Sequence, residues 1–324
     1  MAAGRPRHAG VGDRPVSLRQ ARPLGALVLA ALFWGSAATF IKFALDSWQP
    51  MTLLTVQLLG ANLVLWITLL VRGYRRPSQL GRLALIGLLE PGLCYALITT
   101  GLQYTTAANA AVIAGLESCL VVVLAAIFLR ERISGRGTLG LLLAVVGVLA
   151  LAGSHPDSPV NLGDVLTLAG ILSAAVYVLV ARGIAGTVDS LTMTAHQFAF
   201  GLAVILPFGL VEGPSAIRDH STGDWLTAIS IGVIGFAGSF LLYNYALAHV
   251  RASRAGIVLN LMPIFGVASA VIVLDEWITV WQACGAALVV ASIFIFPADG
   301  EAQHDLVPDD AWRCLGGPRS DLGQ

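Results

Sequence analysis

The sequence predicts an all-α integral membrane protein with ten transmembrane helices in two inverted five-helix repeats. The first observation is composition: 56% of the 324 residues are hydrophobic, 12% are charged, and the mean hydropathy is +0.80. Soluble domains carry about 25% charged residues, so the long uncharged runs of this chain indicate a membrane protein. The second and third observations are a duplicated segment and a one-sided distribution of arginine.

The first apolar run follows a basic lead. Residues 1–23 contain five arginines among glycines and prolines, and we expect them to be disordered and cytoplasmic. The run from Leu24 to Leu45 has about the 20 residues that a membrane helix needs. It is longer than the apolar region of about 7–15 residues in a signal peptide, so we predict a retained helix.

Nine further apolar runs follow, and several are joined by short links that favour antiparallel packing. Residues 24–152 would form the first repeat and residues 162–297 the second, and residues 298–324 read as a disordered, acidic, cytoplasmic tail. The nine runs are Met51–Val71, Leu83–Gly101, Ala107–Leu129, Thr138–Ala152, Leu162–Ala181, Leu191–Val211, Trp225–Leu247, Ala252–Leu274 and Trp277–Phe296.

The duplication is clearest between residues 97–151 and 242–296. Without gaps, 14 of these 55 positions are identical at an offset of 145, where chance would give about one in ten in so apolar a chain. A looser correspondence at an offset of 140 sets Gln57 over Gln197. The chain therefore contains two copies of one sequence unit.

The arginines fix a predicted orientation. With a cytoplasmic N-terminus, the inner segments before the tail hold 15 arginines, whereas the outer ones hold only Lys42 and Arg218. This is a positive-inside pattern. Five helices per repeat is an odd number, so the second copy must enter the membrane inverted. The inner hinge Arg130-Glu131-Arg132 agrees, because its outer copy Asp275-Glu276-Trp277 has lost both arginines. Inverted repeats are typical of secondary transporters.

Several motifs resemble the EamA-like branch of the drug/metabolite transporter superfamily. They are Trp34-Gly35-Ser36, Tyr104-Thr105-Thr106-Ala107, Leu129-Arg130-Glu131-Arg132-Ile133-Ser134, Tyr243-Asn244-Tyr245-Ala246-Leu247 and Leu261-Met262-Pro263. The resemblance implies a central cavity between helices 1–4 and 6–9, with helices 5 and 10 at the periphery. It also implies export or exchange of small metabolites or drugs, often with protons.

The chain departs from this family at two places. Gln57 stands where helix two commonly has an arginine, and Glu117-Ser118 stands where helix four often has a proline. The second copy keeps its proline, Pro263. What the resemblance implies about the substrate is weakened accordingly.

Two acidic residues fall near the middle of predicted spans. A charge at mid-bilayer costs about 2.5–3.5 kcal/mol on insertion scales, so Glu117 and Glu90 need a reason to be there. Lost solvation favours the protonated form of a buried carboxyl group. A carboxyl group exposed to each side in turn could therefore carry a proton or contact substrate. The alternative is a protonated glutamate that only forms a hydrogen bond to a neighbouring helix.

Eight more polar or aromatic residues complete the candidate substrate and proton pathway. Asn109 lies eight residues before Glu117, nearly on the same helix face, and Asn260 lies three before Pro263. The others are Tyr243, Tyr95, Trp34, Gln57, Gln197 and His196. Stacking against a flat or cationic substrate and plain helix packing both account for the aromatic residues. For Asn260, an interhelical hydrogen bond and a place in the pathway are equally good explanations. For a lone histidine, such a hydrogen bond is the better explanation.

These features favour a secondary transporter of the plasma membrane with a small-molecule substrate, which is neither an enzyme nor a nucleic-acid-binding protein. No cofactor or metal is expected, since the four cysteines and six histidines are scattered and no phosphate loop occurs. An integral-membrane enzyme and a non-transporting receptor are the alternatives. Four glycines on the fifth and tenth spans fit a homodimer contact and packing within one chain equally well: Gly137, Gly140, Gly147 and Gly285.

Overall fold

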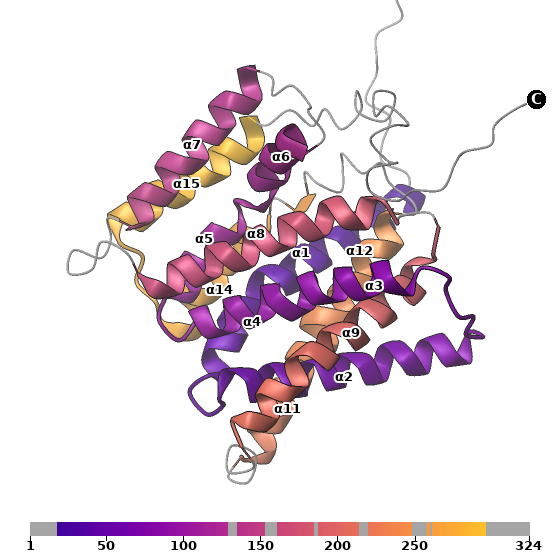
Figure 1. The fold of residues 1–324 in the computed structure, drawn as a ribbon. Coiled ribbons are helices and arrows are strands. Elements are labelled where there is room, and N and C mark those ends of the chain that lie inside the picture. Colours follow the sequence, from indigo (N-terminus) through magenta and orange to yellow (C-terminus); the bar gives the residue numbers. More distant parts are fainter. Residues whose placement is uncertain are drawn as a thin grey trace, which may run out of the picture.

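The protein is built from apolar helices, as the computed structural model shows over residues 18–128, 135–152, 161–184, 187–213, 220–247, 258–259 and 261–295 (Figure 1). Among these residues, seven helical stretches are long and apolar enough to cross a membrane. Three shorter apolar stretches lie in α7, α14 and α15. The predicted all-α, ten-helix class is confirmed.

The helices of each repeat follow in chain order. Repeat 1 contains α1 (Leu18–Ala44), α2 (Pro50–Val71), α3 (Leu80–Gly87), η1 (Leu88–Leu93), α4 (Cys94–Gly101), α5 (Ala107–Ala114), α6 (Glu117–Phe128) and α7 (Gly135–Ala152). Repeat 2 contains α8 (Leu162–Arg182), α9 (Ser190–Val211), α11 (Thr222–Ser230), η2 (Ile231–Gly238), α12 (Ser239–Leu247), α14 (Met262–Leu274) and α15 (Val280–Ile295).

Two predicted spans of repeat 1 differ from single straight helices. The third span is interrupted by η1, a wider helical turn around Glu90 and Pro91. The fourth span ends at Ala114, turns through Gly115 and resumes at Glu117. The first helix begins at Leu18, six residues before its predicted start. Residues 1–17, Asn260 and the predicted tail at 298–324 lie outside the described residues.

The duplication is visible in the helix boundaries. Helices α2 and α9 each have 22 residues, and their ends lie 140 positions apart. The segments η1 and η2 are both wide helical turns. They end at Leu93 and Gly238, which are 145 positions apart. Both offsets found in the sequence therefore join equivalent structural elements.

The packing pairs helices from different repeats. Helix α2 packs along α9, and α1 packs along α14 and α12. The largest buried cluster lies between α1, α2, α9 and η2, where Phe198 and Leu54 are fully buried. Helices α7 and α15 form a separate pair at one side of the bundle (Figure 1). Gly147 lies against the carbonyl group of Gly285 in that pair, so these glycines serve packing within one chain; a homodimer stays a prediction.

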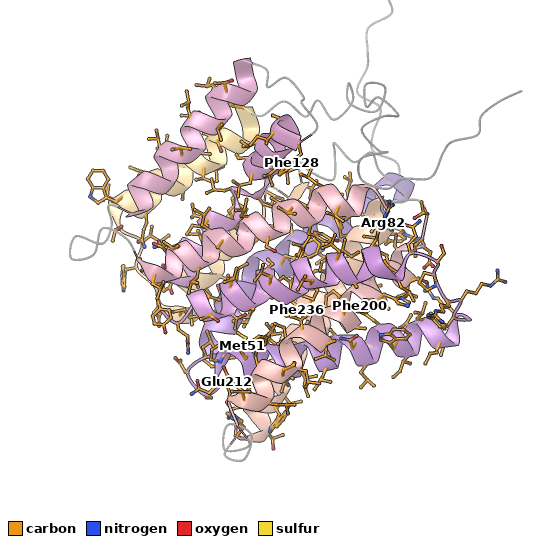
Figure 2. The ribbon with its side chains drawn as sticks, in the orientation of Figure 1. Met51, Arg82, Phe128, Phe200, Glu212 and Phe236 are labelled. Carbon is orange, nitrogen blue, oxygen red and sulfur yellow. The ribbon has the colours of Figure 1, made fainter. Side chains whose placement is uncertain are left out.

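The bundle has two chemically different ends. The end that holds Glu212 and Glu276 is called the acidic end, and the end that holds Arg72, Arg75 and Arg82 is called the basic end. Figure 2 shows Met51 beside Glu212 at one end of the bundle and Arg82 at the other. These ends frame the candidate site between them.

Candidate functional site

The centre of the site is the interruption around Glu90. Glu90 has φ −147° and ψ 121°, outside the helical region, and the next residue is a proline without an N–H. Such a break exposes carbonyl groups that need hydrogen-bond donors inside a membrane. Helices of repeat 2 supply them: Gln197 Nε2 donates to the Glu90 carbonyl oxygen at 2.8 Å, and Ser173 Oγ donates to the Leu89 carbonyl oxygen at 2.9 Å.

Glu117 lies beside this break because the turn after α5 places it at the start of α6. The carboxyl groups of Glu90 and Glu117 are close enough to interact electrostatically. Tyr95 and Tyr177 interact with both of them. Tyr177 Oη also lies 3.5 Å from Gln197 Oε1. We call these five residues the glutamate cluster; it joins α4, η1 and α6 of repeat 1 to α8 and α9 of repeat 2.

Aromatic rings extend the cluster toward α1 and α12. The ring of Tyr95 lies 4.4 Å from that of Phe236, and Trp34 packs edge-on against Tyr243 at 5.5 Å. Tyr243 interacts electrostatically with Tyr177. Carboxyl groups can take up and release protons, and aromatic faces attract flat or cationic groups. The arrangement can therefore bind an amphipathic or cationic molecule next to a titratable pair.

His196 does not belong to this cluster, although it precedes Gln197. Its Nδ1 lies 2.8 Å from the Thr192 carbonyl oxygen, which can only accept, so Nδ1 carries a proton and donates. Its Nε2 lies 3.3 Å from Tyr74 Oη, and its ring packs against Trp66 at 5.1 Å. The side chain is 4% exposed. His196 thus anchors α9 to the loop after α2 at the basic end.

Asn109 is likewise separate from the glutamate cluster. Its expected common face with Glu117 rests on one continuous helix, and the turn after Ala114 interrupts that helix. The Asn109 Oδ1 atom instead accepts a hydrogen bond from Gln282 Nε2 at 2.8 Å, and its Nδ2 lies 3.5 Å from Asp164 Oδ1. Asn109 therefore ties α5 to α15 and α8 at the acidic end.

Gln57 also lies outside the glutamate cluster and is fully buried in α2. Its carbonyl group touches Gly232 of η2, and neither atom of its side-chain amide has a hydrogen-bond partner. Asn260 lies outside the described residues. The structure thus brings together Glu117, Glu90, Tyr95, Gln197, Tyr243 and Trp34.

Two carboxylates at the acidic end cap helices of the other repeat. Glu212, after α9, accepts from the backbone N–H groups of Met51 at 3.0 Å and Thr52 at 2.7 Å, and from Thr52 Oγ1 at 2.8 Å. Glu276, after α14, accepts from the N–H groups of Ala107 at 2.9 Å and Ala108 at 3.0 Å. A negative charge at a helix N-terminus is stabilising. These two contacts, the cross-repeat caps, bond both repeats together at this end.

Sequence reasoning did not identify these caps. The partners are 160 residues apart for Thr52 and Glu212 and 169 apart for Ala107 and Glu276. The one local signal in the sequence is that Gln49, the residue before α2, is not among the residue types that usually cap a helix N-terminus.

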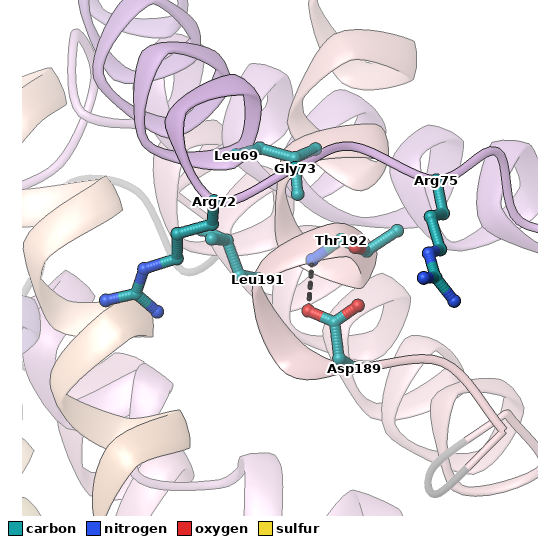
Figure 3. Close-up of a pocket in the computed structure, with 7 residues that line it drawn as sticks. All are labelled: Leu69, Arg72, Gly73, Arg75, Asp189, Leu191 and Thr192. Carbon is teal, nitrogen blue, oxygen red and sulfur yellow. Dashed lines mark hydrogen bonds between the residues drawn. The ribbon is translucent and has the colours of Figure 1, made fainter.

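The basic end differs at the equivalent position. Arg72 stands there in place of Glu212, 140 positions away, and it lines a pocket of about 220 Å³ with Arg75, Asp189 and Thr192 among others. The two guanidinium groups point away from each other (Figure 3). Helix α9 is capped by its own Asp189, which accepts from the Thr192 N–H at 3.0 Å.

The Asp189 carboxylate has a perturbed pKa. Partial burial acts to raise the pKa, but hydrogen bonds from Thr192 and from the backbone of Leu191 outweigh it, so the pKa lies below its ordinary value. Asp189 therefore stabilises α9 as an anion.

Known proteins resemble this chain throughout its helical part. The model of the EamA-like transporter family matches residues 22–153 and 161–296. An uncharacterized transporter of Archaeoglobus fulgidus is 28% identical over 273 residues, covering 83% of this chain and 96% of the relative. The WAT1-related protein At3g02690, chloroplastic, of Arabidopsis thaliana is 24% identical over 282 residues, covering 83% and 68%.

A solved crystal structure shares the fold. It has a TM-score of 0.58 at 18% identity, and the match covers 88% of this chain and 99% of that one. Both kinds of similarity span the two repeats.

Proposed function

Since the chain belongs to the EamA-like transporter family, we propose that it is a secondary active transporter that exports or exchanges small metabolites, amino-acid-like compounds or drugs. The observation that carries the proposal is the glutamate cluster. Glu90 and Glu117 lie in apolar helical spans that both pack against α8, beside tyrosine hydroxyl groups and an interrupted helix. An ionisable pair inside a membrane bundle is costly and marks a substrate or ion pathway.

The inverted repeats support alternating access as the mechanism. The cross-repeat caps bond the two repeats at the acidic end, whereas the equivalent position at the basic end borders a pocket. This asymmetry supports a state that is closed at the acidic end. The opposite state would break the caps and expose the glutamate cluster to that side.

The arginine distribution supports a basic end in the cytoplasm, with both termini on that side. The plasma membrane is the proposed location. Protons are the proposed coupling ion, because each carboxyl group of the cluster can bind a proton in one state and release it in the other. An integral-membrane enzyme and a non-transporting receptor are the alternative classes that the experiment must exclude.

Comparison of metabolites in the medium and cytosol of cells with and without the protein tests the function. We expect at least one compound to move into the medium when the protein is present. An unchanged metabolite profile, with the protein present in the membrane, would contradict export.

Glu117→Gln tests the coupling. The exported compound is loaded into proteoliposomes, and its transport is measured with and without a pH gradient. We expect the variant to abolish gradient-driven transport, because an amide cannot carry the proton. Asp275→Asn, which neutralises an exposed carboxylate, serves as the matched control and should transport normally. Unchanged gradient-driven transport by Glu117→Gln would overturn proton coupling through this residue.

A further inference from the structure

The duplication produces the same helix crossing twice. Gly87 of α3 lies against the carbonyl group of Gln197 in α9, and Gly232 of η2 lies against the carbonyl group of Gln57 in α2. A Cβ atom at either glycine would collide with that carbonyl oxygen. The glycines are 145 positions apart and the glutamines 140, so the offsets of the two repeats relate one crossing to the other.

At the first crossing, the side-chain amide of the glutamine forms hydrogen bonds. Gln197 Nε2 donates to the carbonyl oxygen of Glu90, three residues after Gly87, at 2.8 Å. Tyr177 Oη lies 3.5 Å from Gln197 Oε1. Both halves of the amide are therefore engaged, and the interrupted helix is held in place.

At the second crossing, the side-chain amide of the equivalent glutamine forms no hydrogen bond. Gln57 is 0% exposed, and neither Nε2 nor Oε1 has a hydrogen-bond partner. The carbonyl group equivalent to that of Glu90 belongs to Gly235, three residues after Gly232, and it accepts from Ser239 Oγ at 2.7 Å.

Two sequence differences account for the missing partners of Gln57 in the state seen here. At the offset of 140, Ala37 stands where repeat 2 has Tyr177, so Gln57 Oε1 lacks a hydroxyl donor. The acceptor for Nε2 is missing because Phe236 stands where repeat 1 has Pro91. Segment η2 is therefore not interrupted, and the carbonyl group of Gly235 accepts from Ser239 Oγ instead. A buried amide donor without a partner destabilises the state that contains it.

We propose that Gln57 and Gln197 are equivalent positioning residues that exchange roles during alternating access. In the state seen here, closed at the acidic end, Gln197 holds η1 through Glu90. In the opposite state, Gln57 Nε2 takes the carbonyl group of Gly235 and holds η2, while Gln197 releases Glu90. The inference rests on the proposed function, because only a protein that visits both states can exchange these bonds.

The exchange follows from the energetics of two states. A group that is unpaired in one state and paired in the other shifts the equilibrium toward the second. Gln57 thus favours opening at the acidic end, and Gln197 favours closure. The release of Glu90 also links opening to the glutamate cluster, since the carbonyl group that Gln197 holds belongs to a residue of that cluster.

A thiol reporter at the acidic end tests the proposal. Ala110 of α5 is 2% exposed in the closed state, and Ala110→Cys is introduced into full-length protein with Cys284→Ser and Cys314→Ser. The protein is placed in nanodiscs, where both faces are accessible, and the rate of labelling by a charged maleimide is measured. Protein without the reporter corrects for the buried Cys94 and Cys119.

Opposite shifts are expected from the two glutamines. Gln57→Leu removes the unpaired amide of the closed state and the bonded amide of the open state, so labelling should slow by roughly tenfold. Gln197→Leu should accelerate labelling by a similar factor. Thr99→Val is the matched control, because Thr99 is also 0% exposed with an unpaired hydroxyl group but lies at neither crossing; its labelling should match that of the parent.

The outcomes separate this inference from the proposed function. If the parent is labelled and Gln57→Leu behaves like Thr99→Val, the exchange is wrong and alternating access stands. A shift in the same direction for both glutamine variants would also overturn the exchange. If the reporter is never labelled in any variant, alternating access fails and the exchange fails with it. Gln57→Leu decides alone should Gln197→Leu not fold, since removing an unpaired amide should not impair folding.

Discussion

At the scale of single residues, a glycine is required where a neighbouring backbone occupies the space that a Cβ atom would take. Gly87 and Gly232 are such positions, because each lies directly on a glutamine carbonyl group. The sequence shows both glycines at the offset of 145, but it does not show what they touch. The glutamines that they touch are related by the other offset, 140. Only the folded structure shows that the two sets of positions meet.

One added methyl group tests these crossings. Gly232→Ala should lower the unfolding free energy by about 1–3 kcal/mol or more, because its Cβ meets rigid backbone atoms of Gln57. Gly81→Ala is the matched control: Gly81 lies in α3 with nothing within 4 Å of the added Cβ. That control should be neutral or gain about 0.5–1 kcal/mol. Thermal unfolding in detergent micelles measures both, and equal midpoints would contradict the crossing.

At the scale of helices, capping divides into local and distant cases. Thr106, Asn161 and Asp189 cap the helices that they precede, and short polar residues before apolar runs make such caps predictable. The N-terminus of α2 has no local cap and relies on Glu212. No sequence rule pairs a helix start with a carboxylate 160 residues away, so the distant caps emerge only from the fold.

The Asp189 cap should respond to pH. Its pKa is lowered in the folded state from the ordinary value of 3.8, so folding favours the anion. The stabilisation is therefore complete above 3.8 and is lost as the pH falls through the lowered pKa. Asp189→Asn keeps a capping oxygen without the charge. We expect the wild type to be more stable at pH 7 and the difference to shrink as the pH falls below 3.8; a constant difference in thermal midpoint would contradict the cap.

At the scale of the whole molecule, the duplication accounts for most of what the sequence predicts. Ten apolar runs and an odd repeat lead to the inverted fold, and two membrane-embedded glutamates lead to the centre of the candidate site. The cross-repeat caps at the acidic end were not predictable, because they depend on contacts between repeats. Tyr177 joins Glu90 and Glu117 for the same reason: α8 crosses η1 only once both repeats are packed.

Both cross-repeat caps should contribute to the proposed closure of the acidic end. Glu212 and Glu276 bond different helix pairs, yet a rigid movement of the repeats must break both. Each charge at a helix N-terminus contributes about 1 kcal/mol, which corresponds to roughly fivefold in an equilibrium. Glu212→Gln and Glu276→Gln should each accelerate labelling of Ala110→Cys about fivefold.

The double variant distinguishes one gate from two local contacts. If both caps oppose the same opening, their free energies add and the rates multiply, giving roughly 25-fold faster labelling. If each cap only stabilises its own helix end, labelling in the double variant equals that of the faster single variant. Asp275→Asn neutralises the exposed residue beside Glu276 and should leave labelling unchanged. Acceleration by Asp275→Asn as well would assign the effect to net charge, and closure would then not depend on the caps.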